Sequence, residues 1–246
     1  MRPDILEELG MLENIRCIGF DADDTLWENE LFYAEAEEGF IDVMQYSDKS
    51  DLSFDYLART EEQNMACLGY GAKAMTISMI EAAIAMDPNI SSDKILKLIE
   101  IGKKLFAVPT EMRQNAAEVL HILQQRYRVV IITKGELNEQ QRKFKNSPLD
   151  KNIDYFVLDN KTADTYRHLL AREHIDINTF LMVGNSPKSD ILPILELGGY
   201  AAYIPSNVTW IHEQGILPEH PKLLKPKNIR DILGLLNIDC DMPPEK

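Results

Sequence analysis

Five short apolar runs, each ending at polar, small or acidic residues, constrain the fold of this chain more than any other feature. They occupy residues 17–20, 129–132, 155–158, 180–183 and 200–204. Apolar runs of four or five residues without alternation are typical of strands that are buried on both faces. Helical patterns separate the last four runs, and strands that alternate with helices predict a doubly wound parallel sheet of the α/β class.

The helices between these strands are predicted at residues 110–125, 161–172 and 187–197. The first pattern places apolar side chains on one face at the spacing of an amphipathic helix. The third helix is expected to begin after Ser186 as N-cap, with Pro187 in the first helical position.

A long insertion follows the first strand. More than 100 residues separate the runs at 17–20 and 129–132, and most of them have helical patterns. Residues 71–86 are apolar nearly all round, which predicts a central helix, and another helix is expected after Ser91. We therefore expect an α-helical cap over residues 27–107, inserted in a core formed by residues 1–26 and 108–246. Extra helices packed flat against the sheet are the alternative.

Charge and composition limit the partners. The formal net charge is −14, and an acidic surface repels the phosphates of nucleic acids and anionic lipids. The first residues lack the apolar segment of a signal peptide, and no run approaches the roughly 18 apolar residues of a membrane span. Three widely separated cysteines without a CxxC pair fit a reducing compartment. These features predict a cytoplasmic protein that binds neither nucleic acid nor membrane, and they imply no protein partner.

Residues that can carry chemistry follow four of the five predicted strands. Because ligand sites in open parallel sheets lie at the carboxyl ends of the strands, we expect these residues to gather at one edge. They are Asp21-Ala22-Asp23-Asp24-Thr25, Thr133-Lys134-Gly135, Lys161 before a helix, and Gly184-Asn185-Ser186-Pro187-Lys188-Ser189-Asp190.

The acidic run calls for a positive partner. Asp21 and Asp23 point to the same side because alternate residues of an extended chain share a face. Two carboxylates about 4 Å apart repel each other by about 4 kcal/mol at an effective dielectric constant near 20. Oxygen ligands without His or Cys favour Mg²⁺.

Taken singly, each feature has a plainer interpretation: a solvated turn for the aspartates, a helix cap for Thr133, a solvated side chain for Lys161, and a capped turn for residues 184–190.

Taken in order, the four motifs resemble those of the haloacid dehalogenase (HAD) superfamily, specifically its phosphohydrolases with a helical cap. Residues 21–25 match the DxDxT motif that follows the first strand. Thr133 matches the Ser or Thr that ends the second strand, and Lys161 matches the lysine of the third motif. Residues 184–190 match the fourth motif, usually Gly-Asp-Ser followed by a further Asp. The resemblance covers essentially the whole chain.

Three positions depart from the family pattern. Asp24 stands where Gly is frequent, and it adds negative charge beside the expected site. Asn185 stands where an acidic metal ligand is usual. Thr162, after Lys161, replaces a common Pro.

The resemblance implies a Mg²⁺-dependent phosphatase that hydrolyses a small phosphate monoester through an aspartyl-phosphate. Asp21 would be the nucleophile, and Asp23 would act as general acid and then as general base. The implied metal ligands are Asp21, the main-chain carbonyl of Asp23, and Asn185 or Asp190. Thr133 and Lys161 would complete the catalytic set. The implied phosphate-binding residues are Thr25, Thr133, Lys134, Gly135 and Lys161.

Sister activities remain as alternatives. The presence of Asp23 argues against a carbon–halogen dehalogenase, which needs neither a metal nor an acid for a leaving alkoxide. A phosphomutase would use the same residues, and a non-catalytic relative could bind a phosphorylated metabolite without turnover. The predicted cap implies a small substrate, because a closing lid leaves little room for a protein.

Overall fold

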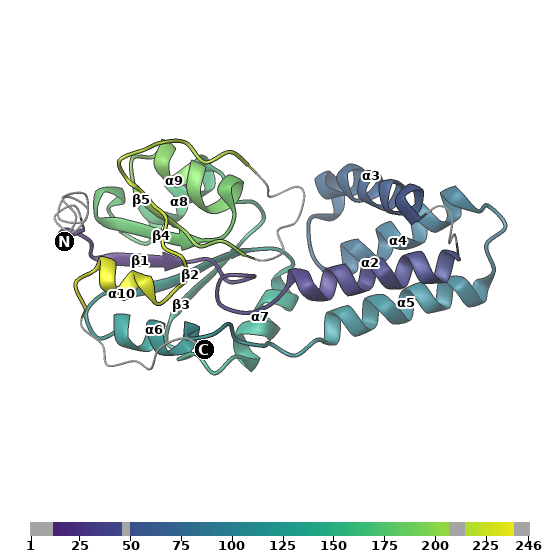
Figure 1. The fold of residues 1–246 in the computed structure, drawn as a ribbon, viewed down its shortest axis with the longest axis horizontal. Helices are drawn as coiled ribbons and strands as arrows, with labels where there is room; N and C mark the ends of the chain where they lie inside the picture. The colour runs from purple at the N-terminus through teal and green to yellow at the C-terminus, as the bar shows by residue number, and fades with distance from the viewer. Residues whose placement is uncertain (1–11, 46–49, 207–214, 239–246) are drawn as a thin grey trace. The chain divides into compact units, whose positions relative to one another are not determined.

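The computed structural model describes residues 12–45, 50–206 and 215–238. As far as these ranges reach, the chain forms two compact units (Figure 1). The α/β unit comprises Met1–Glu28, Glu111–Thr133 and Ser147–Lys246, and the helical unit comprises Asn29–Thr110 and Lys134–Asn146.

A six-stranded sheet forms the centre of the α/β unit in the described residues, in the order β3-β2-β1-β4-β5-β6. Its strands are β1 (Cys17–Phe20), β2 (Arg128–Lys134), β3 (Asp154–Leu158), β4 (Phe180–Gly184), β5 (Tyr200–Tyr203) and β6 (Leu223–Leu224). Strand β1 pairs in parallel with both β2 and β4. The order of connection therefore reverses at β1, and the ends of β1 and β4 flank the switch point where ligands bind in such sheets. The prediction of a doubly wound parallel sheet is confirmed, and all five predicted strands are present.

Helices of the α/β unit lie between these strands in the sequence, except for the last of them, which follows β6. They are α6 (Ala116–Leu123), α8 (Ala163–Arg172), α9 (Leu192–Glu196) and α10 (Asp231–Leu235), with a 3₁₀ turn η1 (Ile177–Thr179) and a π-helical turn η2 (Pro187–Ile191). Ser186 caps η2 by accepting a hydrogen bond from the Ser189 amide at 3.0 Å, which confirms the predicted cap. The predicted helix at 187–197 is divided between η2 and α9, so Asp190 lies in a π-helical turn.

Helix α6 begins six residues later than the sequence predicts. Residues 110–115 are not helical because their backbone pairs with the loop after β1 instead. Met112 forms a bridge with Trp27, and the Arg113 amide donates to the Leu26 carbonyl at 2.9 Å. Asn115 then adopts a left-handed conformation, with φ of 63°, immediately before the helix.

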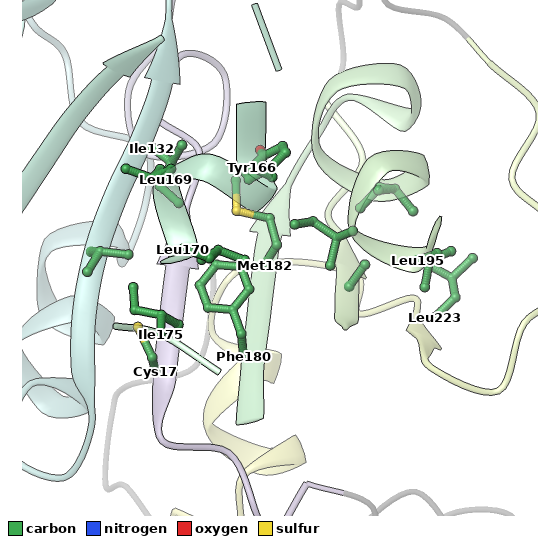
Figure 2. Close-up of a cluster of buried hydrophobic side chains, with 14 residues drawn as sticks. Cys17, Ile132, Tyr166, Leu169, Leu170, Ile175, Phe180, Met182, Leu195 and Leu223 are labelled. Atoms are coloured by element: carbon green, nitrogen blue, oxygen red, sulfur yellow. The ribbon is translucent and has the colours of Figure 1, made fainter. Parts of the chain in front are cut away.

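The core of the sheet is packed with side chains from strands and helices. In Figure 2, side chains from β1, β4 and α8 point toward one another, among them Cys17, Phe180 and Leu170. Phe180 occupies the space where a Cβ atom of residue 19 would lie, which accounts for a glycine inside β1. Close packing of this kind fixes the strand ends that carry the polar residues.

The helical unit contains five helices in its described part. They are α2 (Glu30–Met44), α3 (Ser50–Leu68), α4 (Ala72–Met86), α5 (Ser92–Ala107) and α7 (Leu137–Asn146). Helix α4 packs against both α3 and α5, as expected of a central helix. However, Ile77 and Ile84 are 46% and 48% exposed, so α4 is not buried all round as its apolar sequence suggests.

Polar contacts attach α7 to the other helices of this unit. The buried Glu139 carboxylate accepts a hydrogen bond from the Ala72 amide at 2.9 Å, at the start of α4. The Lys143 ammonium donates to the Asn29 side chain at 2.6 Å. The predicted cap, residues 27–107, does not include α7, whose contacts group it with the helices. The assignment of these units as core and cap stays a prediction.

No helix among the described residues is both long enough and apolar enough to cross a membrane.

Candidate active site

Asp21 follows β1 directly and is held between two strands. Its amide donates to the Val183 carbonyl of β4 at 2.9 Å, and the residue is 7% exposed. The carboxylate accepts a hydrogen bond on each oxygen. Oδ1 accepts from the Lys161 ammonium at 2.5 Å, and Oδ2 accepts from the Thr25 hydroxyl at 2.9 Å. Thr25 and Lys161, two of the residues expected to gather at this edge of the sheet, therefore lie against Asp21.

Lys161 is buried between two carboxylates. Its Nζ atom lies 2.5 Å from Asp21 Oδ1 and 2.7 Å from Asp190 Oδ1, and the residue is 3% exposed. Buried charges are stable in proteins only when they are paired in this way. The alternative of a solvated lysine is wrong. The helix that follows is capped by Thr162, whose hydroxyl accepts from the Thr165 amide at 3.2 Å.

The cluster of Asp21, Asp190 and Lys161 contains two carboxylates and one ammonium group. Burial and the nearby Asp190 raise the pKa of Asp21 to about 7, although Lys161 acts to lower it. Burial alone would lower the pKa of Lys161, but the carboxylates of Asp190 and Asp21 raise it well above its ordinary value. Burial and the second carboxylate outweigh the ammonium in setting the pKa of Asp21, whereas the two carboxylates outweigh burial in setting the pKa of Lys161. The cluster carries an excess of negative charge that a further cation would neutralise.

Asp190 uses both carboxylate oxygens within the protein. Oδ1 accepts from Lys161, and Oδ2 accepts from the Ser186 amide at 3.0 Å. The residue is fully buried. Gly184 is required here, because a Cβ atom at that position would collide with the Asp190 carboxylate.

The Asn185 side-chain amide faces oxygen atoms of the first motif. The terminal amide atom that is turned toward the first motif lies 3.2 Å from Thr25 Oγ1, 3.2 Å from Asp21 Oδ2 and 3.3 Å from the Asp23 main-chain oxygen. Amide orientation is assigned from such surroundings. With nitrogen on that side, the amide donates to these oxygens. With oxygen on that side, the single Thr25 hydroxyl hydrogen is shared between Asp21 Oδ2 at 2.9 Å and Asn185 Oδ1 at 3.2 Å. Acceptor oxygens of Asp21, Asp23 and Asn185 then face one another, an arrangement that a cation would stabilise.

Asp23 is fixed by a residue that the sequence analysis did not consider. The indole nitrogen of Trp27 donates to Asp23 Oδ1 at 2.6 Å. The intervening Asp24 adopts a left-handed conformation, with φ of 58°, and its carbonyl accepts from the Arg113 guanidinium. A tryptophan two residues after the acidic motif, and four after Asp23, is the sequence signal that could have identified Trp27.

Tyr155 of β3 is a second residue that the sequence analysis did not consider. Burial raises its pKa, and the carboxylates of Asp23 and Asp21 add to this effect. Its phenol is therefore within electrostatic reach of the acidic motif. A tyrosine at the start of a buried strand carries no sequence signal of such a role.

The second motif is divided between the two units. Thr133 is buried at the end of β2, the strand next to β1. Lys134 and Gly135 belong to the helical unit, where the Lys134 ammonium lies 4.3 Å from the centre of the Tyr70 ring. Phosphate binding by these three residues stays a prediction.

The donors that could hold a metal are of mixed type. No group of three or more His, Cys, Asp or Glu side chains in the described residues is arranged to hold a metal ion. With its oxygen turned toward the first motif, Asn185 would complete a set of one carboxylate, one main-chain carbonyl and one amide oxygen. These are oxygen donors of the kind that Mg²⁺ accepts.

Comparisons with known proteins agree with this architecture. A solved structure described as a haloacid dehalogenase-like family hydrolase from Xanthomonas campestris is 32% identical, covers 91% of this chain and 93% of its own, and has a TM-score of 0.81. YfnB from Bacillus subtilis, solved bound to magnesium, is 16% identical over 91% of this chain and 99% of its own, with a TM-score of 0.65. A 2-haloacid dehalogenase from Pseudomonas syringae pv. Tomato DC3000 is 17% identical over 91% and 98%, with a TM-score of 0.62.

No protein with a curated description matches the sequence significantly. The haloacid dehalogenase-like hydrolase family matches residues 15–198, a range that includes β1 to β4 and every site residue described above. The chain therefore belongs to the haloacid dehalogenase-like hydrolase family.

Proposed function

We propose that this hydrolase is a Mg²⁺-dependent phosphatase that acts on small phosphate monoesters by phosphoryl transfer to Asp21. The observation that carries the proposal is the position of the Asn185 amide, one atom of which lies 3.2 Å from Asp21 Oδ2 and 3.3 Å from the Asp23 main-chain oxygen. Neighbouring oxygens of an octahedral shell with bonds of 2.0–2.1 Å are about 2.9 Å apart, which supports Asn185 as a neighbour of these two oxygens around Mg²⁺.

The proposed ligands are Asp21 Oδ2, the Asp23 main-chain oxygen and Asn185 Oδ1. Asp190 is assigned a different role, because its carboxylate contacts Lys161 and the Ser186 amide, whereas Asn185 is the residue that faces the Asp21 and Asp23 oxygens. Asp190 then holds Lys161 against the nucleophile. Bound Mg²⁺ would neutralise negative charge on the nucleophile and on the phosphoryl oxygens.

The reaction follows from the positions of Asp21 and Asp23. An oxygen of Asp21 attacks phosphorus while Asp23 gives its proton to the leaving alkoxide, so an oxygen–phosphorus bond forms as the ester bond breaks. Asp23 then takes a proton from water, which attacks the aspartyl-phosphate and releases inorganic phosphate. Lys161 and Thr133 would stabilise the phosphoryl oxygens, with Thr25 completing the phosphate site in the α/β unit.

The dehalogenase chemistry of a structural relative is the second candidate. It would use Asp21 alone as nucleophile. The carboxylate at position 23, fixed by a hydrogen bond, favours the phosphatase because only a leaving alkoxide needs a proton. A phosphomutase, or a relative that binds a phosphorylated metabolite without turnover, would retain the same geometry.

Phosphate release from p-nitrophenyl phosphate, measured with Mg²⁺ and with EDTA, tests the proposal. We expect hydrolysis that requires Mg²⁺. A panel of sugar phosphates, nucleotides and small phosphorylated acids would then identify the substrate class. Absence of phosphate release from every ester at saturating Mg²⁺ would contradict the proposal and favour the non-catalytic alternative.

Asn185→Asp is expected to lower the Mg²⁺ concentration needed for half-maximal activity by about tenfold, because a charged ligand raises the affinity of a cation site. Without metal, the added carboxylate faces Asp21 and should lower the melting temperature. A Mg²⁺ titration followed by both activity and thermal unfolding measures the two effects.

Gln125→Glu, the same chemical change at an exposed position, is the matched control and should change neither property. Asp190→Ala should lower activity at every Mg²⁺ concentration, but it should not change the Mg²⁺ concentration needed for half-maximal activity. A selective increase in that requirement would instead make Asp190 the metal ligand.

A further inference from the structure

Trp27 makes a specific hydrogen bond to the residue proposed as general acid and base. Its side chain is fully buried, and its Nε1 atom lies 2.6 Å from Asp23 Oδ1. An indole N–H can only donate a hydrogen bond. Asp23 Oδ1 is therefore kept as an acceptor, whatever the protonation state of the carboxyl group.

The backbone around Trp27 holds this donor in place. The Asp24 amide donates to the Trp27 carbonyl at 2.7 Å, and Trp27 forms bridges with both Asp23 and Met112. On the other side, the Glu28 amide donates to the Glu111 carbonyl at 2.9 Å. The chain is thus fixed before, at and after the tryptophan, all within the α/β unit.

We infer that Trp27 is a positioning residue that orients the Asp23 carboxyl group and directs its exchangeable proton to Oδ2. A proton on Oδ1 would reduce the ability of that oxygen to accept from the indole, so Oδ2 is the favoured site. The inference rests on the proposed phosphatase function, since only there does Asp23 transfer a proton to a leaving group.

The consequence depends on the leaving group of the substrate. An alkoxide leaves as a strong base and needs the proton of Asp23 as the ester bond breaks. A p-nitrophenolate leaves readily without a proton. Loss of the indole N–H should therefore reduce kcat/KM for an alkyl phosphate and change it little for p-nitrophenyl phosphate. A merely structural role would reduce both values alike.

The test compares kcat/KM for the best alkyl phosphate of the substrate panel with kcat/KM for p-nitrophenyl phosphate. In Trp27→Phe, the ratio of the alkyl to the aryl value should fall about ten- to hundredfold, the range that corresponds to a hydrogen bond to a charged group. A second variant carries β-(3-benzothienyl)alanine at position 27, which keeps the shape of tryptophan and lacks only the N–H. Because the chain has two tryptophans, this analogue is introduced in a Trp210→Phe background, which serves as its reference.

Phe180→Leu is the control for loss of packing, because Phe180 is fully buried in β4 and donates no hydrogen bond to a site residue. Its kcat/KM ratio should equal that of the wild type. An unchanged ratio in the benzothienyl variant would overturn the inference, even if Trp27→Phe does not fold. Failure of the wild type to hydrolyse either ester would instead contradict the proposed function.

Discussion

Asp21→Asn is expected to abolish phosphate release while the protein stays folded. The amide keeps the shape of the carboxylate and can still accept a hydrogen bond from Thr25, but it cannot accept a phosphoryl group as a nucleophile. Phosphate release from the purified variant measures the loss of activity, and circular dichroism measures whether the fold is retained. A folded variant with activity near that of the wild type would exclude covalent transfer to Asp21.

The same variant should be more stable than the wild type at alkaline pH without Mg²⁺. The folded-state pKa of Asp21 is raised from 3.8 to about 7, so ionisation destabilises the folded state increasingly as the pH rises between these values. Asp21→Asn removes this destabilisation. Its free energy of unfolding, measured in urea, should exceed that of the wild type fully above pH 7 and not at all below pH 4. Asp55→Asn, at an exposed position, should give no such pH dependence.

Lys161→Met is expected to cause the largest loss of stability among single substitutions at the site. It leaves the Asp21 and Asp190 carboxylates buried without their shared ammonium. Removal of one partner from a buried ion pair costs about 3–5 kcal/mol in the free energy of unfolding. Phosphatase activity should be lost as well, because the site then lacks its buried positive charge.

The loss in Lys161→Met should be greater at pH 8 than at pH 5. Without the ammonium the pKa of Asp21 rises further above 7, so the carboxyl group is neutral at pH 5 and costs less to bury. Adding Asp190→Asn to Lys161→Met should restore part of the stability, which a double-mutant cycle measures. Lys145→Met, at an exposed lysine, should change stability by less than about 0.5 kcal/mol. An equally small change in Lys161→Met would show that the buried pair is not formed.

The sheet could be predicted because each central strand is a continuous apolar run that must be buried on both faces. The start of α6 could not be predicted, because residues 112 and 113 pair with the backbone of Trp27 and Leu26, which are distant in the sequence. Strand β6 is only two residues long and has no periodicity to detect. The attachment of α7 to the helical unit depends on buried polar contacts of Glu139 and Lys143, which a charged amphipathic sequence does not reveal.

The candidate site was predictable to the extent that strand ends meet at one edge of the sheet. Asp21, Lys161, Asn185 and Asp190 do lie together. The contact between Lys161 and Asp190 was not predictable, because it depends on the direction of the Asp190 side chain, which leaves a π-helical turn. The sequence therefore leaves Asn185 and Asp190 as alternative metal ligands, and the proposal of Asn185 rests on its contacts with the Asp21 and Asp23 oxygens.

Parallel measurement of inorganic phosphate released from phosphate monoesters and of halide released from 2-chloropropionate tests the central claim most directly. Each reaction is run with Mg²⁺ and with EDTA, and with Asp21→Asn as the control for contaminating enzymes. We expect phosphate release that requires Mg²⁺ and Asp21, and no halide release. Halide release that depends on Asp21 and persists in EDTA, without phosphate release, would contradict the account.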